Sequence, residues 1–252
     1  MSNTNSDTCI EFDDVVAGYG EFMILNNLSL KARRGKITLL LGPNGAGKST
    51  VLKTLFGMLK VRQGSIKLDG QSIVGASPKQ LLVDHGIAFV PQGRNLFGQL
   101  TAYENLELGG ITLGMKTTRE RIPEVLQLFP RVKERLNSAA SSMSGGEQKQ
   151  LEVGRALLLR PKVILIDEPS IGLSPMVVQD VFRLLRKLAD EQGVTVLMVE
   201  QNVKSALKMA DEAIALESGR LVLHKRADEL LADPNIERLF LGGAHAAAPK
   251  AA

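Results

Sequence analysis

Residues 42–49 constrain the fold of this chain more than any other segment. They read Gly-Pro-Asn-Gly-Ala-Gly-Lys-Ser and fit the pattern G-x-x-x-x-G-K-[ST]. An apolar strand is predicted before them at 36–41. A helix is predicted after them at 50–59, where apolar residues recur at helical spacing: Val51, Leu52, Leu55, Met58 and Leu59. In such a strand–loop–helix unit, backbone N–H groups and the helix N-terminus converge on one concave surface that favours phosphate oxygens.

The loop therefore predicts a nucleotide-phosphate site. We expect Lys48 to place its charge near the β- and γ-phosphates. We expect Ser49 to offer its hydroxyl to Mg²⁺, which prefers hard oxygen ligands. The residues expected to bind the nucleotide in this segment are Gly42, Pro43, Asn44, Gly45, Ala46, Gly47, Lys48, Ser49 and Thr50.

The surrounding pattern is that of an α/β protein. Alternating apolar residues in the first forty positions predict a short antiparallel β element. Further along the chain, apolar strands alternate with helices and the pattern closes on a hairpin: strands at 163–166 and 194–199, helices at 145–160, 178–191 and 203–210, and a turn at 218–219. This alternation predicts a mostly parallel sheet covered by helices.

An inserted α-helical subdomain is expected within this core. The stretch from 101 to 141 loses the strand pattern and gains charge, and we place the whole insertion at about 95–160. We expect one domain over residues 9–242, with flexible tails at 1–8 and 244–252.

Composition excludes several other classes. No apolar run reaches the ~18 residues that a membrane-spanning helix needs. The polar residues 1–8 predict no secretory signal, so we expect a cytosolic chain. A single cysteine, Cys9, excludes a disulfide framework. A net charge of +4, with Lys and Arg scattered among acids, no Trp and two Tyr, argues against nucleic-acid binding.

Two acids, Asp167 and Glu168, follow the strand predicted at 163–166. A parallel strand delivers such carboxylates to the sheet edge at which the phosphate loop also lies. We expect Asp167 to reach Mg²⁺ and Glu168 to polarise an attacking water as a general base. Read alone, the two acids could equally be a solvated pair.

The segment Ser144-Gly145-Gly146-Glu147 precedes another predicted helix. A serine hydroxyl and two glycine N–H groups at a helix start form a second anion site. One nucleotide hardly needs two such sites in one chain, so a site shared by two chains would explain both. Read alone, the segment is a favourable N-cap and nothing more.

The order of these motifs resembles the ATP-binding subunits of ABC transporters over nearly all of residues 9–242. The matching segments are 42–50, Gln92, 143–148 and 163–168. The resemblance implies a P-loop NTPase core and a head-to-tail dimer, in which each ATP lies between the phosphate loop of one chain and residues 144–147 of the other. It also implies that Tyr19 stacks on adenine and that Gln92 contacts Mg²⁺ and the attacking water.

The resemblance further implies partners and a location. The partners are a second ABC ATPase chain (a paralogue or a copy of this one), two membrane-spanning permease subunits that dock beside the helical subdomain, and indirectly a periplasmic solute-binding protein. The chain would then lie peripherally on the cytoplasmic face of the inner membrane. A pI near 9.2 is compatible with an anionic membrane surface.

Two residues depart from the common pattern of that family. Gln201 stands where a histidine is usual, so a neutral amide would face the γ-phosphate. Ser174 stands where the dimer-contact loop usually has an aspartate. These departures, together with the closing Leu241-Gly242-Gly243, resemble the ATPases that import branched-chain or hydrophobic amino acids.

Other functions stay open on the sequence. The ATPases of urea and short-amide importers are close relatives, which the run from Val90 to Arg94 does not separate. A soluble ABC ATPase of the iron–sulfur assembly type, without a membrane partner, has a similar size. A P-loop kinase or GTPase would leave Gln92 and the segment 143–148 unexplained.

Overall fold

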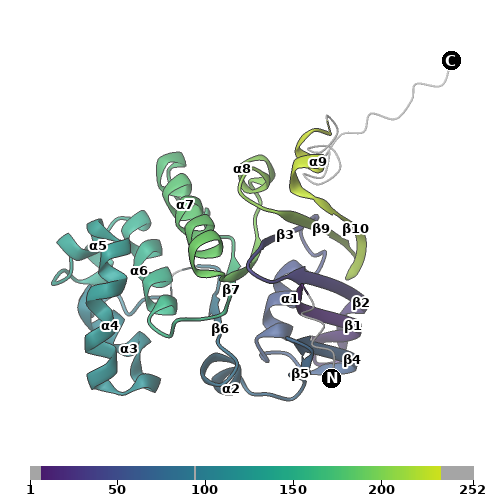
Figure 1. Cartoon of the computed structure of the whole chain (residues 1–252), viewed down its shortest axis with the longest axis horizontal. Coiled ribbons are helices and arrows are strands. Elements are labelled where there is room, and N and C mark those ends of the chain that lie inside the picture. Colours follow the sequence, from purple (N-terminus) through teal and green to yellow (C-terminus); the bar gives the residue numbers. More distant parts are fainter. Residues whose placement is uncertain (1–6, 94, 234–252) are drawn as a thin grey trace.

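The computed structural model describes residues 7–93 and 95–233, arranged around two β-sheets (Figure 1). An antiparallel sheet has the strand order β2-β1-β4-β5, and a six-stranded sheet has the order β10-β9-β3-β8-β7-β6. The strands are β1 (Thr8–Tyr19), β2 (Phe22–Arg33), β3 (Ile37–Leu41), β4 (Val61–Leu68), β5 (Gln71–Ser72), β6 (Ile87–Val90), β7 (Val163–Asp167), β8 (Thr195–Val199), β9 (Glu212–Glu217) and β10 (Arg220–Arg226).

Helices cover the six-stranded sheet and extend from it. They are α1 (Lys48–Leu55), α2 (Pro78–Val83), α3 (Ala102–Gly109), α4 (Met115–Leu128), α5 (Pro130–Glu134), α6 (Gly145–Leu157), α7 (Pro175–Gln192), α8 (Val203–Leu207) and α9 (Ala227–Leu231), with 3₁₀ turns at Ile111–Leu113 and Ala140–Ser142. Figure 1 shows α3 to α6 gathered on one side of the molecule and the antiparallel sheet on the other. The predicted α/β class, with its antiparallel N-terminal element and its helical region, is confirmed.

The parallel strands of the large sheet bring their carboxyl ends to one edge. Strand β3 pairs in parallel with β8 and β9, and β7 pairs in parallel with β6 and β8. Every residue of β3, β7 and β8 is buried, as expected for strands that are covered on both faces. The loops that follow these strands therefore meet along one edge, where α/β proteins bind ligands.

The helix predicted at 50–59 is shorter in the structure. Helix α1 ends at Leu55, and Gly57 follows with φ +71°. A Cβ at Gly57 would lie 2.6 Å from the carbonyl oxygen of Ala76, so the chain turns tightly here against the segment before α2. Met58, predicted on the apolar face, is 54% exposed. The prediction for Met58 was wrong, because the helical pattern contains no signal for a turn imposed by a distant segment.

Other predicted elements hold with shifted ends. The predicted face of α4 is buried (Ile122, Val125, Leu126 and Phe129), and Pro130 begins α5. Helices α6 and α8 end at Leu157 and Leu207, each three residues earlier than expected. The short helices α2 and α9 were not predicted. Strand β1 begins at Thr8, one residue before the expected start of the domain.

Several sequence predictions lie outside the described residues. They concern Arg94, the closing residues 241–243, the tail at 244–252 and most of the tail at 1–8.

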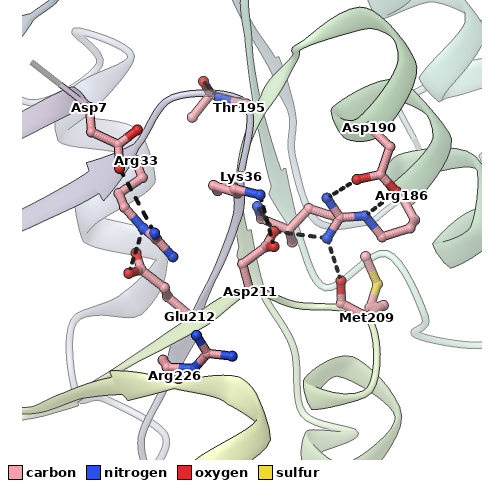
Figure 2. Close-up of polar contacts among 12 residues, drawn as sticks. Asp7, Arg33, Lys36, Arg186, Asp190, Thr195, Met209, Asp211, Glu212 and Arg226 are labelled. Carbon is pink, nitrogen blue, oxygen red and sulfur yellow. Dashed lines mark hydrogen bonds and ion pairs between the residues drawn. The ribbon is translucent and has the colours of Figure 1, made fainter. Parts of the chain in front are cut away.

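A carboxylate fastens α7 to the large sheet (Figure 2). Asp211 Oδ2 accepts hydrogen bonds from the Ile37 N–H and from Arg186 Nη1, each at 2.8 Å, and Lys36 Nζ lies 3.5 Å from Oδ1. Arg186 also pairs with Asp190 on its own helix at 2.6 Å. Burial raises the pKa of Asp211, but the bonds from Ile37 and Arg186 outweigh it, and the net pKa is lowered. Asp211, directly before β9, thereby ties α7 to the start of β3.

Candidate nucleotide site

The predicted phosphate loop joins β3 to α1 and holds a backbone that side chains would disturb. Gly42 has φ +139°, and a Cβ there would lie 2.2 Å from the carbonyl oxygen of Leu216. Gly47, the N-cap of α1, has φ +101°. The Gly219 N–H donates to the Ala46 carbonyl at 3.0 Å, so the hairpin of β9 and β10 braces the loop. Glycine is therefore required at Gly42 by close approach and at Gly47 by backbone conformation.

The Lys48 side chain lies inside this loop and binds its backbone carbonyls. The residue is buried, and its Nζ donates to the carbonyls of Gly42 at 2.8 Å and Pro43 at 2.9 Å. Burial lowers the pKa of Lys48, while the charges of Glu168 and Asp167 oppose that shift. The ammonium thus lies within the concave loop, and its contact with phosphate stays a prediction. Thr50 is buried in the first turn of α1.

Ser49 and Asp167 meet at the edge of the sheet. The Ser49 hydroxyl donates to Asp167 Oδ1 at 3.1 Å, although 118 residues separate the two. Asp167 is 2% exposed; burial raises its pKa and the hydrogen bond from Ser49 lowers it, with a net rise. Within residues 7–93 and 95–233, no group of three or more His, Cys, Asp or Glu side chains could hold a metal unaided. One hydroxyl and one carboxylate instead fit Mg²⁺, which often takes its other oxygens from phosphates and water.

Glu168 lies between two amide side chains. Gln92 Nε2 donates to one carboxylate oxygen at 2.7 Å, and Gln201 Nε2 donates to the other at 2.8 Å. The backbone of Glu168 has φ +50°, and its N–H bonds to the Val199 carbonyl at 2.9 Å. The loops after β6, β7 and β8 therefore bring together all three residues predicted to take part in catalysis.

Glu200 is a buried acid that was not predicted to belong to the site. It is 2% exposed and accepts hydrogen bonds from the N–H and the hydroxyl of Ser170, each at 2.7 Å. Burial raises the pKa of Glu200, and the bonds from Ser170 oppose the rise. The signal that could have found it is an acid placed directly after the buried strand β8, because a carboxylate at a buried strand end needs donors.

Tyr19 lies at the end of β1, beside α1. Its ring is partly exposed, with the Lys53 ammonium 5.8 Å from the ring centroid and 3.4 Å from the hydroxyl oxygen. Lys53 was not predicted at the site.

Residues 144–147 form the N-terminus of α6. Ser144 Oγ accepts from the Glu147 N–H at 3.3 Å, and Glu147 Oε2 accepts from the Ser144 N–H at 2.7 Å. In the single chain this segment is therefore an N-cap, which is the alternative to an anion site shared by two chains. Gly146 lies against α7, since a Cβ there would lie 2.6 Å from Val177 Cγ1. Ser144 and Gly145 are exposed.

The fold and the loop with its acidic strand end define a P-loop ATPase. The ABC transporter family matches residues 25–171. The branched-chain amino acid transport ATP-binding protein BraG of Pseudomonas aeruginosa is 44% identical over 93% of this chain and 100% of its own length. The probable branched-chain amino acid transport ATP-binding protein LivF of Archaeoglobus fulgidus is 38% identical over 90% of this chain and 95% of its own length.

A solved structure agrees with these relatives. The ADP conformation of MJ1267, an ATP-binding cassette of an ABC transporter, superposes with a TM-score of 0.83 at 27% identity, over 93% of this chain and 99% of that one. The chain belongs to the ABC transporter family as an ATP-binding subunit with ATPase activity, and the resemblance seen in its sequence is confirmed. Among the helices of the described residues, none has the length and apolar character to span a bilayer.

Proposed function

We propose that this chain is the ATP-hydrolysing subunit of an importer for branched-chain or other hydrophobic amino acids. The observation that carries the hydrolytic role is Glu168, a buried carboxylate held at the end of β7 beside the phosphate loop. The amino acid class rests on the similarity to BraG and LivF, which extends over nine tenths of the chain. The import direction rests on the resemblance of the sequence alone.

The site residues have separate roles in nucleotide binding and hydrolysis. Residues 42–50 hold the phosphates, and Tyr19 stacks on the adenine ring, an interaction worth about 1–3 kcal/mol in base-binding sites. Ser49, Asp167 and Gln92 would hold Mg²⁺, which would neutralise charge on the phosphate oxygens. Glu168 accepts a proton from the attacking water, and Gln201 donates a hydrogen bond beside the γ-phosphate.

We infer that the active form is a dimer of ATPase chains, with a paralogue or a second copy. Ser144 and Gly145 are exposed at the N-terminus of α6, where two N–H groups and a hydroxyl can reach a phosphate of the partner's nucleotide. ATP then selects the closed dimer, and hydrolysis releases it. The whole of 9–242 acts as one domain, with 95–160 as its helical part.

We further propose that cytoplasmic helices of two permease subunits dock beside that helical part. A groove of about 210 Å³ lies between β6 and α6, lined by aromatic, apolar and charged side chains that include Phe56, Phe89, Pro91, Glu152 and Arg155. Such docking would hold the chain at the cytoplasmic face of the inner membrane. A periplasmic binding protein would supply the solute from the other side.

Co-purification tests this assignment. The full chain is tagged, membranes are extracted in mild detergent, and the recovered proteins are identified by mass spectrometry. We expect two membrane-spanning subunits and a second ATPase chain. Recovery from the soluble fraction alone would overturn the transporter and favour a soluble ABC ATPase, such as the iron–sulfur assembly type.

The solute is tested on the binding protein that belongs to the recovered complex. Calorimetric titration with leucine, isoleucine and valine should give saturable binding, and titration with urea and acetamide should give none. The reverse result would replace amino acids by short amides and would leave the ATPase assignment intact.

A further inference from the structure

The Glu200 carboxylate joins two turns of the site that are far apart in the sequence. Its Oε1 accepts from the Ser170 N–H, and its Oε2 accepts from the Ser170 hydroxyl, both at 2.7 Å. The same Oε2 accepts from the backbone N–H of Gln201 at 3.0 Å and of Asn202 at 3.4 Å. One buried anion thus receives four donors, two from the turn after β7 and two from the turn after β8.

Each turn begins at a residue of the proposed hydrolytic centre: the first turn at Glu168 and the second at Gln201. Ser170 lies two residues after Glu168, and the Ile171 N–H returns to the Glu168 carbonyl at 3.3 Å, so the turn begins at the acid itself. The second turn begins at Gln201, whose side chain extends to Glu168 Oε1. Gln201 is exposed, and two hydrogen bonds hold its backbone: its N–H donates to Glu200 at 3.0 Å, and its carbonyl accepts from the Val203 N–H at 2.9 Å.

We propose that Glu200 is a positioning residue for ATP hydrolysis, which holds the Ser170 turn and the Gln201 turn at the separation that lets the Gln201 amide meet Glu168. This inference rests on the proposed function, in which Glu168 activates water. The Lys48 ammonium bonds to the carbonyls of the phosphate loop and the Ser49 hydroxyl bonds to Asp167, so Glu200 is a hydrogen-bond partner of neither. Its loss should therefore reduce turnover more than nucleotide binding.

Charge is the reason that a carboxylate stands here. Hydrogen bonds to an ionised acceptor are stronger than those between neutral groups, and a carboxylate can accept all four donors on two oxygens. An amide at this position would offer one acceptor oxygen. Its N–H group would face the one donor now at Oε1 or the three donors now at Oε2, depending on which way the amide turns. The isosteric substitution Glu200→Gln thus breaks the link with little change in volume.

The test uses a double-mutant cycle on the full chain, purified in the assembly in which it is recovered. Steady-state ATPase rates and ATP affinity are measured for wild type, Glu200→Gln, Gln201→Ala and the double variant. The exposed Glu191→Gln on α7 is the matched control for loss of one negative charge. We expect Glu200→Gln to lower kcat about tenfold, with a change in ATP affinity below about twofold. In the Gln201→Ala background it should lower kcat no further.

A purely structural Glu200 would behave differently. It would lower the thermal midpoint and reduce kcat by the same factor in both backgrounds, and that result, or an unchanged kcat, overturns the inference. Ser170→Ala removes one donor and keeps the charge, so it enters the same cycle with Gln201→Ala if Glu200→Gln does not fold. A wild-type assembly without ATPase activity would overturn the proposed function and this inference with it. If the wild type is active, a failure of the cycle overturns the role of Glu200 and leaves the proposed function intact.

Discussion

Gln201 donates a hydrogen bond from Nε2 to Oε1 of Glu168 over 2.8 Å, although 33 residues separate the two in the chain. Gln92 donates to the other oxygen at 2.7 Å, so each oxygen of the carboxylate faces an amide. An amide neither gains nor loses a proton in the physiological range. The donor that faces Glu168 from β8 is therefore insensitive to pH, unlike the histidine usual at this position in the family.

Replacement of this amide by histidine should create a pH dependence. An imidazole titrates near pH 6.5 and donates most strongly when protonated. We expect the ratio of kcat for Gln201→His to kcat for wild type to be highest near pH 6 and to fall by about pH 7.5. ATPase assays across this range, with the exposed Lys208→His as control, measure the ratio. A flat ratio would show that the site does not use the charge of the imidazole.

Loss of the loop ammonium should abolish tight nucleotide binding. Lys48→Ala removes the charge held between the carbonyls of Gly42 and Pro43. We expect ATP affinity to fall about a hundredfold, because charge-assisted contacts to phosphate are lost in a buried site. Binding is measured with a fluorescent ATP analogue, with the exposed Lys60→Ala as control. Unchanged affinity would reject the phosphate loop as the nucleotide site.

Removal of the charge at Glu168 should separate binding from hydrolysis. Glu168→Gln keeps the volume of the side chain but removes the acceptor for a water proton, so we expect kcat to fall about 10²–10⁴-fold with ATP binding retained. The variant should accumulate as a closed dimer in ATP, seen by size-exclusion chromatography. The control is the exposed Glu217→Gln, which should keep normal ATP turnover and should not accumulate as a closed dimer. Undiminished turnover in Glu168→Gln would remove this residue from catalysis.

The Asp211 network predicts a stability effect with a defined pH dependence. The folded pKa of Asp211 is below its ordinary value of 3.8, so its ionised form stabilises the fold above that pH, and the contribution is lost as the pH falls through the folded pKa. We expect Asp211→Asn to cost about 2 kcal/mol at pH 7 and progressively less below about pH 4.

Urea unfolding at pH 7 and near pH 3.5 measures this effect. Asp228→Asn, in a surface pair with Arg226, is the control and should change the midpoint little. An equal loss of stability at both pH values would show that charge at Asp211 is not the cause.

The local features of this protein follow from its sequence. A phosphate loop is a run of eight consecutive residues that would bind phosphate through its own backbone, so residues 42–49 predict it without reference to any other segment. The buried faces of α4 and α7 follow from helical spacing for the same reason, since each face is set within one helix.

The arrangement of the site was decided by the tertiary structure. Gln92, Glu168 and Gln201 were named from the sequence, but their contacts depend on β6, β7 and β8 lying side by side, which no local pattern encodes. The roles of Glu200, Lys53 and Asp211, and the early end of α1 at Leu55, depend likewise on segments distant in the chain. Secondary-structure propensity and hydrophobic periodicity act over a few residues. The partners of a buried charge depend instead on how the strands and helices pack.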